Sequence, residues 1–206
     1  MPTRKGPSWK QFIASHLDTA WATDFFTEEV WHKFGMMTCH VLFFIHLKTR
    51  RVYIANVTEH PNAEWVQQQS RNFRMHLERI GLSCRFLIHD RDKCFKPMDA
   101  LLEKTSHIQP IKTPPYAPQA NAFAERFVRE ARETLDNLIL VGEGSLYRTM
   151  KKIERHHNFQ RPHQGIDNRI PVAYIYPASP APPVSVQCHA EIPCLLNHYF
   201  VDIKAA

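Results

Sequence analysis

The chain has 206 residues, of which 44% are hydrophobic and 22% charged, and its formal net charge at pH 7 is +6. These values fit a globular protein with one main domain and exclude wholesale disorder. No apolar run approaches the roughly 20 residues of a membrane helix, and the first ten residues lack the apolar segment of a signal peptide.

The first half of the chain predicts three strands that run back and forth. Residues 20–26 are a short apolar run with one embedded acid, residues 36–47 are long, apolar and aromatic, and residues 51–57 follow. The polar residues 48–50 have the length of a hairpin turn, so the last two runs should pair antiparallel.

The apolar pattern then changes to helical spacing. Residues 62–80 predict a helix, with Asn62 or His60 near its cap and Gly81 at its end. The elements that follow are a buried strand at 85–89, a short helix at 96–106 and a short strand at 108–112.

The second half is mainly helical. Residues 113–119 are a Pro-rich loop, which we expect to act through Tyr116 as a flexible flap over a site. Residues 120–140 carry the clearest helical pattern of the chain, and two glycines break it. A further helix should cover residues 145–158, with Ser145 as its N-cap.

This order of elements predicts an α/β fold with a mixed five-stranded sheet flanked by helices. We expect a core over residues 1–171 and a Pro-rich C-terminal extension over residues 172–206. The extension should begin as a linker or extended strap, and its apolar tail should dock as a short element.

Three acids stand among apolar residues in three separate elements. Asp24 lies inside the first strand, Asp90 directly follows a buried strand, and Glu125 lies near the start of the strong helix. An unpaired buried carboxylate costs several kcal/mol, so this placement is unusual. For each acid alone, a local ion pair is an alternative, since Arg91 and Arg126 adjoin two of them.

Together, the three acids predict a cluster that binds divalent cations. Carboxylate oxygens suit Mg²⁺ or Mn²⁺, and a bound cation removes the repulsion between converging negative charges. Two such ions about 4 Å apart serve phosphoryl transfer, because one activates the attacking oxygen and the other stabilises the leaving oxygen.

Four short segments carry a resemblance to a known family. They are TDFF at 23–26, HDRDKCF at 89–95, NAFAERF at 121–127 and HNFQRPHQGI at 157–166. In this order they resemble the motifs of DDE catalytic cores, which bacterial insertion-sequence transposases share with retroviral-type integrases. The resemblance covers about residues 18–171, and 34 residues separate Asp90 from Glu125, one fewer than the family usually has.

The resemblance implies an RNase H-like fold in which Asp24, Asp90 and Glu125 are catalytic residues and metal ligands. It implies cleavage of DNA ends and strand transfer of the 3′-OH into target DNA, with two Mg²⁺ or Mn²⁺ ions. An RNase H-like nuclease without joining activity and a catalytically decayed DNA-binding or assembly protein are the alternatives. Asp92 departs from the family's glycine; we favour a bystander over a cap of the next segment or a rival metal ligand.

Basic residues beside Glu125 are candidates for binding double-stranded DNA, in keeping with the positive net charge. Arg129 and Arg132 lie on its helix face at i+4 and i+7, where they could hold phosphates or form solvated pairs with Glu125. Asn121, one turn earlier, could contact DNA or cap the helix, and we prefer the cap.

Three further groups of polar residues are candidates for parts of the active site or of a zinc site. Residues 161–164 could approach the site or pack the final helix. His89 is more consistent with an orienting group than with a ligand. A zinc site from residues 156–157 with Cys188 and Cys194 is disfavoured, because adjacent histidines diverge on a helix and the cysteine spacing is not that of a finger.

The remaining expectations concern location and partners. Five cysteines without a CxxC pair argue against a disulfide framework and favour a reducing cytoplasm, here that of a bacterium, with the protein at the nucleoid. The resemblance implies a homo-oligomer in the active complex. Residues 1–17 leave no room for a helix-turn-helix region, so either a separate chain supplies it or this chain is a partial product.

Overall fold

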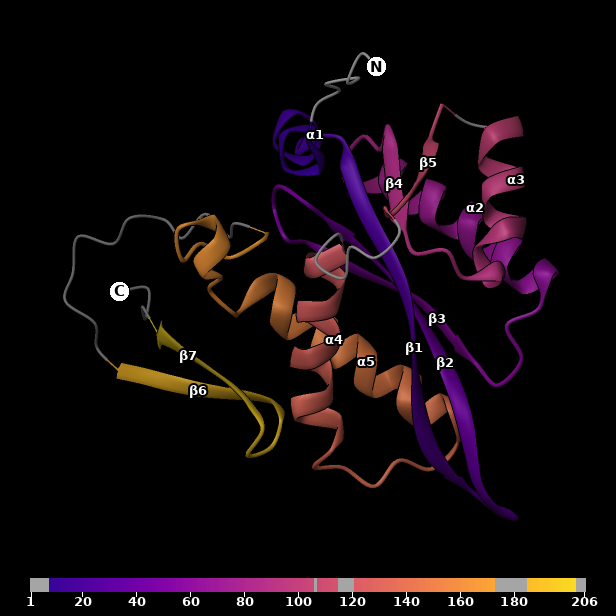
Figure 1. Cartoon of the computed structure of the whole chain (residues 1–206). Helices are drawn as coiled ribbons and strands as arrows, with labels where there is room; N and C mark the ends of the chain where they lie inside the picture. Colours follow the sequence, from indigo (N-terminus) through magenta and orange to yellow (C-terminus); the bar gives the residue numbers. More distant parts are fainter. Residues whose placement is uncertain (1–7, 106, 115–120, 173–184, 203–206) are drawn as a thin grey trace.

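A five-stranded sheet of order β3-β2-β1-β4-β5 forms the centre of the molecule (Figure 1). The computed structural model describes residues 8–105, 107–114, 121–172 and 185–202. The strands of this sheet are β1 (Ala20–His32), β2 (Gly35–His46), β3 (Val52–Thr58), β4 (Phe86–His89) and β5 (Gln109–Lys112). The first three pair antiparallel, and β4 and β5 run parallel to β1. The predicted mixed, RNase H-like sheet is confirmed.

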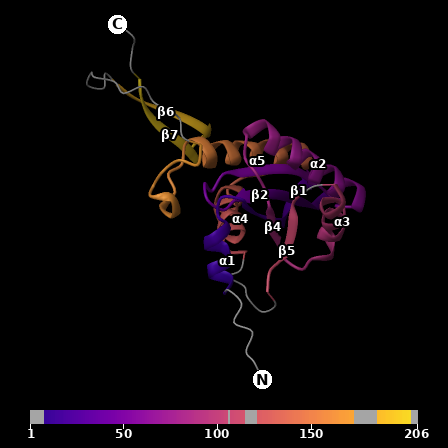
Figure 2. The ribbon, with the colours of Figure 1, turned by 90° about the horizontal axis from the view of Figure 1, so that it is seen from above.

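Helices cover both faces of this sheet (Figures 1 and 2). On one face lie α1 (Trp9–His16), α4 (Ala122–Leu135) and α5 (Gly142–Phe159). On the other lie α2 (Ala63–Ile80) and α3 (Lys96–Thr105), with the short 3-10 helix η1 (Lys93–Phe95) leading into α3. Across the described ranges, no helix is both long enough and apolar enough to cross a membrane.

Side chains along β1 alternate between the two faces of the sheet. In β1, Ala22 is buried in the core under α4 and α5, whereas Trp21 points to the opposite face, where its ring meets that of Phe73 on α2 edge-on at 5.2 Å. Because successive strand residues point to opposite faces, this parity also sets the direction of Asp24.

The helix ends test the predicted caps. Asn62 accepts a hydrogen bond from the Trp65 amide at 2.9 Å, and Gly81 has a φ of +66°, so both predictions for α2 are confirmed. The predicted Ser145 cap is wrong, because α5 already begins at Gly142. The start is earlier because the Trp31 amide at the end of β1 donates to the Leu140 carbonyl, which fixes the turn between α4 and α5.

Three elements depart from the predicted bounds. The first strand extends to His32, six residues beyond the prediction, because its polar outer half pairs with β2 as a two-stranded ribbon. The helix over 120–140 ends at Leu135. A helix that was not predicted, α1, precedes β1 and begins with a capping box at Ser8.

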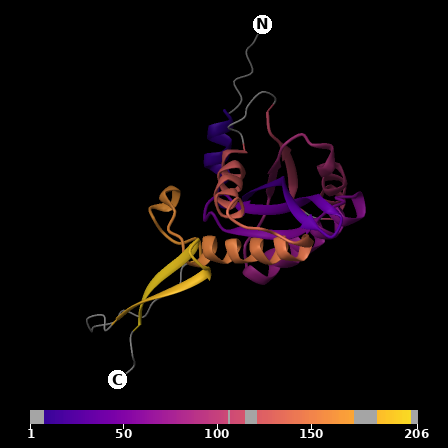
Figure 3. The ribbon, with the colours of Figure 1, turned by 90° about the horizontal axis from the view of Figure 1, so that it is seen from below.

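The C-terminal extension is more regular than a strap. Strands β6 (Ser185–Ile192) and β7 (Leu196–Asp202) form an antiparallel hairpin beside the C-terminal end of α5 (Figure 3). The buried Glu191 accepts from Arg155 Nε at 2.9 Å and from Gln160 Nε2 at 3.0 Å. The tail therefore docks as expected, although residues 185–192 are a strand and not a linker.

An asparagine of α5 closes the outer edge of the sheet. Asn158 Nδ2 donates to the Val52 carbonyl at 2.7 Å, and its Oδ1 accepts from the Val52 amide at 2.8 Å. Both residues are buried. The side chain thus replaces a neighbouring strand for β3, whose backbone groups would otherwise lack partners.

Replacing Asn158 by Ala should lower the free energy of unfolding by about 2–4 kcal/mol, because the Val52 amide and carbonyl are then buried without partners. Urea unfolding followed by circular dichroism measures the loss. The control is Asn137→Ala, which removes an exposed hydrogen bond to the Glu133 carbonyl and should cost less than about 1 kcal/mol. Equal losses in both variants would contradict this role of Asn158.

Candidate active site

The parallel pairing of β1 with β4 brings the first two acids together. Ala22 pairs with Ile88, and two residues further along each segment lie Asp24 and Asp90. Ala22 and Ile88 both belong to the core under α4, so the alternation of side chains directs both acids toward that face. The register of one strand pair therefore juxtaposes residues that are far apart in sequence.

The third acid comes from α4, which packs over β1 and β2. Its residues Ala124 and Phe127 are buried against the sheet, and Glu125 lies on the exposed side. Glu125 and Asp24 line one surface cavity of about 370 Å³ together with Arg132. The structure thus brings the predicted acids to a single place at the start of this helix.

Asn121 holds the start of α4 against β1. It occupies the N-cap position, but its side chain makes no capping hydrogen bond, so the predicted cap is wrong. Instead, Nδ2 donates to the Thr23 carbonyl at 3.4 Å, and only 6% of the residue is exposed. Because Thr23 precedes Asp24, this contact fixes Glu125 relative to the first acid.

The electrostatics of Asp24 show how close the acids are. Burial, then the charge of Asp90 and more weakly those of Glu125 and Asp92, together raise the pKa of Asp24 to about 7, against a hydrogen bond from the Phe25 amide that lowers it. Among the described residues, no lysine or arginine forms an ion pair with Asp24, Asp90 or Glu125. The local ion pairs with Arg91 and Arg126, which were the alternative for each acid, are not formed among these residues; Arg91 Nε donates to the Thr113 carbonyl.

Carboxylates that repel one another and lack a cationic partner fit a divalent metal. Their oxygens are the ligands that Mg²⁺ and Mn²⁺ prefer, and a bound ion would reverse the repulsion that raises the pKa of Asp24. The donor set of this site therefore suits the metal ions expected from the sequence.

Comparison with known proteins agrees with this arrangement. Residues 106–171 match the model of the integrase core domain, which covers Glu125 and the start of α4, and the sheet that holds the other two acids has the order of elements of such a core. This segment of the chain is therefore similar to an integrase core domain. No curated protein matches the chain.

Solved structures share the fold of this core at low identity. The catalytic core domain of BIV integrase has a TM-score of 0.52 and 18% identity, with 75% of this chain and 91% of that chain covered. The HTLV-2 integrase catalytic core domain in complex with magnesium has a TM-score of 0.50 and 12% identity, covering 72% and 91%. A chain of the simian T-cell lymphotropic virus intasome in complex with PP2A regulatory subunit B56 gamma has a TM-score of 0.52 and 12% identity. That match covers 83% of this chain but only 62% of the viral one.

Arg129 and Arg132 lie on the exposed side of α4, as the helical spacing predicts. Arg132 lines the cavity of Asp24 and Glu125, whereas Arg129 lines a second pocket on the other side of the helix. In the part of the chain that the structure describes, neither forms an ion pair with Glu125. Both guanidinium groups are therefore available to an anion, and their contact with DNA stays a prediction.

Residues next to Asp90 hold it in place. His89 is fully buried, with Nε2 2.8 Å from Asp99 Oδ1 on α3 and Nδ1 2.6 Å from the Asp90 carbonyl. These contacts agree with a structural or orienting group, and its role at the site stays a prediction. Asp92 accepts from the Cys94 amide at 2.8 Å and caps η1. The predicted alternative of a cap is thus the one observed, although its charge also acts on Asp24.

Glu130 is a residue of this region that the sequence did not single out. His157 Nδ1 lies 3.0 Å from Glu130 Oε1, and Arg161 Nη1 lies 3.1 Å from the same oxygen. Burial acts to raise the pKa of Glu130, but the hydrogen bond and charge of His157 and the charges of Arg161 and His163 outweigh it and lower the pKa. Arg161 thus contacts α4, and His163 Nε2 lies 3.0 Å from the His157 carbonyl of α5. Of the two predicted alternatives for residues 161–164, packing against the final helix is the one observed.

This buried network resembles a metal site in composition only. Ligand atoms of Glu130, His157 and His163 lie within 4.8 Å of one another. However, both ring nitrogens of His157 face oxygen atoms, the second being the Arg50 carbonyl at 2.9 Å. With neither nitrogen available, the cluster is an ion-pair network that joins α4 to α5.

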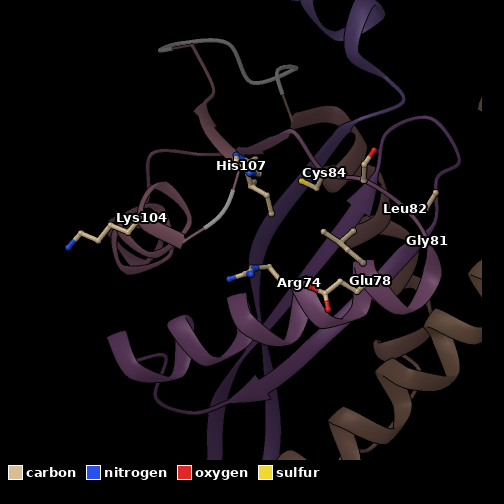
Figure 4. A pocket seen from close by; sticks show the side chains of 10 residues that line it. Arg74, Glu78, Gly81, Leu82, Cys84, Lys104 and His107 are labelled. Atoms are coloured by element: carbon tan, nitrogen blue, oxygen red, sulfur yellow. The ribbon is translucent and has the colours of Figure 1, made fainter.

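Another cavity lies away from the acids, between the end of α2, α3 and β4 (Figure 4). It has a volume of about 820 Å³ and is lined by Arg74, Glu78, Cys84 and His107 among others. None of the three acids or of the arginines of α4 contributes to it, so its size does not make it the active site. Tyr116, the predicted flap residue, lies outside the described residues.

Replacing Asp24 by Asn should stabilise the metal-free protein. The pKa of Asp24 rises from 3.8 unfolded to about 7 folded, so its ionisation weakens folding increasingly from about pH 4 and fully above pH 7. At pH 8 we expect a gain on the order of 2–4 kcal/mol in the free energy of unfolding, since one pKa unit corresponds to about 1.4 kcal/mol.

Urea unfolding in EDTA at pH 8 and pH 5 measures this gain, which should be smaller at pH 5. Glu103→Gln, a change at an exposed acid of α3, is the control and should have little effect at either pH. Added Mn²⁺ should then stabilise the wild type more than Asp24→Asn. A variant that is less stable than the wild type at pH 8 would contradict the repulsion.

Proposed function

We propose that the chain cleaves DNA ends and transfers the resulting 3′-OH into target DNA. The observation that supports this most directly is the convergence of Asp24, Asp90 and Glu125, which have no cationic partner among the residues that the structure describes. Such a cluster on an integrase core suits metal-dependent displacement at phosphorus. The chain's similarity to integrases supports the same reaction class.

Both steps are displacements at phosphorus, so one site serves them. In cleavage, a water oxygen attacks the phosphorus and the bond to the bridging O3′ breaks, which leaves a 3′-OH and a 5′-phosphate. In joining, that 3′-OH attacks a target phosphodiester; one new phosphodiester forms, and the target strand retains a free 3′-OH. No protein nucleophile is consumed.

The chain's own residues hold and position the reactants. Asp24, Asp90 and Glu125 would bind two Mg²⁺ or Mn²⁺ ions, which supply activation of the attacking oxygen and stabilisation of the leaving oxygen. Arg132, in the same cavity as Asp24 and Glu125, would hold a phosphate oxygen beside the scissile bond. Asn121 keeps α4 at β1, so the third acid keeps its place when DNA arrives.

We further propose that the active complex is a homo-oligomer on double-stranded DNA. The HTLV-2 integrase core was solved in a dimeric form with magnesium, and the simian viral chain in an intasome. A separate helix-turn-helix chain would recognise the element's ends, and the bacterial nucleoid would be the place of action.

The three acids should be individually essential. Purified protein with Mn²⁺ and a labelled mixture of DNA duplexes should give nicked and joined products that gel electrophoresis separates. Asp24→Asn, Asp90→Asn and Glu125→Gln should each lower product formation by more than about 100-fold, since even outer-shell partners of metal ligands contribute about 10–100-fold.

The Glu103→Gln protein is the matched control and should keep wild-type activity. Nicking without any joined product would assign a nuclease. Full strand transfer by Asp90→Asn would refute the proposed site, and the absence of products from the folded wild type with bound DNA would favour a decayed core.

A further inference from the structure

A pocket of about 590 Å³ lies on the side of α4 that faces away from Asp24, between this helix and residues 161–165. Four arginines contribute to its lining: Arg50, Arg126, Arg129 and Arg161. Two acids line it as well, Glu130 and Glu133. Because Glu130 is already paired with Arg161 and His157, the pocket keeps an excess of positive charge.

Arg50 is the innermost of these arginines and is held in one orientation. It occupies a left-handed position, φ +65°, in the turn between β2 and β3, and its Nη1 donates to the Leu47 carbonyl at 2.5 Å. Its guanidinium carbon lies 4.0 Å from the centre of the Phe123 ring on α4. A planar guanidinium fixed in this way loses little entropy when it binds an anion.

Gly165 lies against the same guanidinium. A Cβ atom built on Gly165 would lie 3.3 Å from both Nε and Nη2 of Arg50, so the glycine allows the loop to approach it closely. Arg50 Nε is buried and has no hydrogen-bond partner within the described ranges. Among the described residues, the Arg50 guanidinium donates a hydrogen bond from Nη1 to the Leu47 carbonyl. The guanidinium can therefore donate to a further acceptor such as a phosphate oxygen.

Arg126 and Arg129 line this pocket and also lie within one helical turn of Glu125 on α4. Both are exposed, and among the residues that the structure describes neither has an ion-pair partner. Arg126 follows Glu125 directly, and Arg129 lies one helical turn beyond it. Arg50 and Arg126 line the same pocket. Burial, and then the charge of Arg126, lower the pKa of Arg50 to about 10, which leaves Arg50 charged at neutral pH.

We propose that this pocket binds a backbone phosphate of the DNA strand whose reacting phosphate lies at the three acids. Neighbouring nucleotides rise by about 3.4 Å along one strand, and a helical turn rises by about 5.4 Å. A strand that leaves Glu125 along α4 would therefore bring another phosphate to Arg126 and Arg129 within one or two nucleotides, at the mouth of the pocket that these residues line together with Arg50. The inference rests on the DNA substrate of the proposed function, but not on its chemistry.

Binding of a fluorescent random-sequence duplex in EDTA tests the pocket without cleavage. For Arg126→Gln we expect about 5–10-fold weaker binding and a slope of log K against log salt that is smaller by about 1, as for one lost phosphate contact. Arg126→Lys should restore most of the slope. Arg71→Gln, at an exposed position of α2, is the control and should match the wild type.

Arg50 is tested by a spectroscopic signal, because its replacement also removes packing. With ¹⁵N-labelled arginine, the buried Nε–H signal of Arg50, assigned by its loss in Arg50→Lys, should shift on titration with inorganic phosphate and again with the duplex. Displacement of phosphate by the duplex supports the proposal. Phosphate binding that the duplex leaves unchanged would assign a site for free phosphate and overturn the DNA assignment.

The outcomes separate this pocket from the catalytic proposal. Equal duplex binding by wild type, Arg126→Gln and Arg71→Gln would overturn the pocket while leaving the nicking assay to judge the acids. Conversely, a salt slope that falls in Arg126→Gln sustains the pocket even if no product forms with Mn²⁺. A wild type that does not bind the duplex at all would also refute the pocket.

Discussion

The repulsion between three carboxylates is the constraint around which this core is organised. Asp24 is held partly buried near two other acids, and its pKa of about 7 reflects that cost. A fold tolerates such a group only when the surrounding structure fixes it firmly. Here the packed sheet and helices supply the stability that holds the three acids together.

Each acid is fixed by a different kind of contact. The β1–β4 register pairs Ala22 with Ile88, two residues before Asp24 and Asp90. The buried His89–Asp99 pair ties the end of β4 to α3, and Asn121 fastens α4 to β1. On the far side of α4, Glu130 joins the helix to α5 and the segment after it. Thus the helix that carries Glu125 is held on both sides, which suits a ligand set that must not relax apart.

Much of this could be read from the sequence, because alternating and helical patterns survive without tertiary information. The five strands, the helix that carries Glu125 and the three acids were predictable from apolar periodicity and motif order. The early start of α5 was not, because it depends on a long-range hydrogen bond from Trp31. Likewise, nothing local marks Glu130, whose partners His157 and Arg161 come from another helix and a loop, and Asn121 has the residue type of a cap but bonds to a neighbouring strand.

The two edge strands of the sheet, β3 and β5, are both poorly suited to pairing with another copy of the chain. At one edge, Asn158 occupies the backbone of Val52 on β3; at the other, the four-residue β5 contains Pro110, which has no amide hydrogen to offer. Neither edge invites an added strand. In the proposed homo-oligomer, copies of this core would therefore meet through side chains and not by extending the sheet.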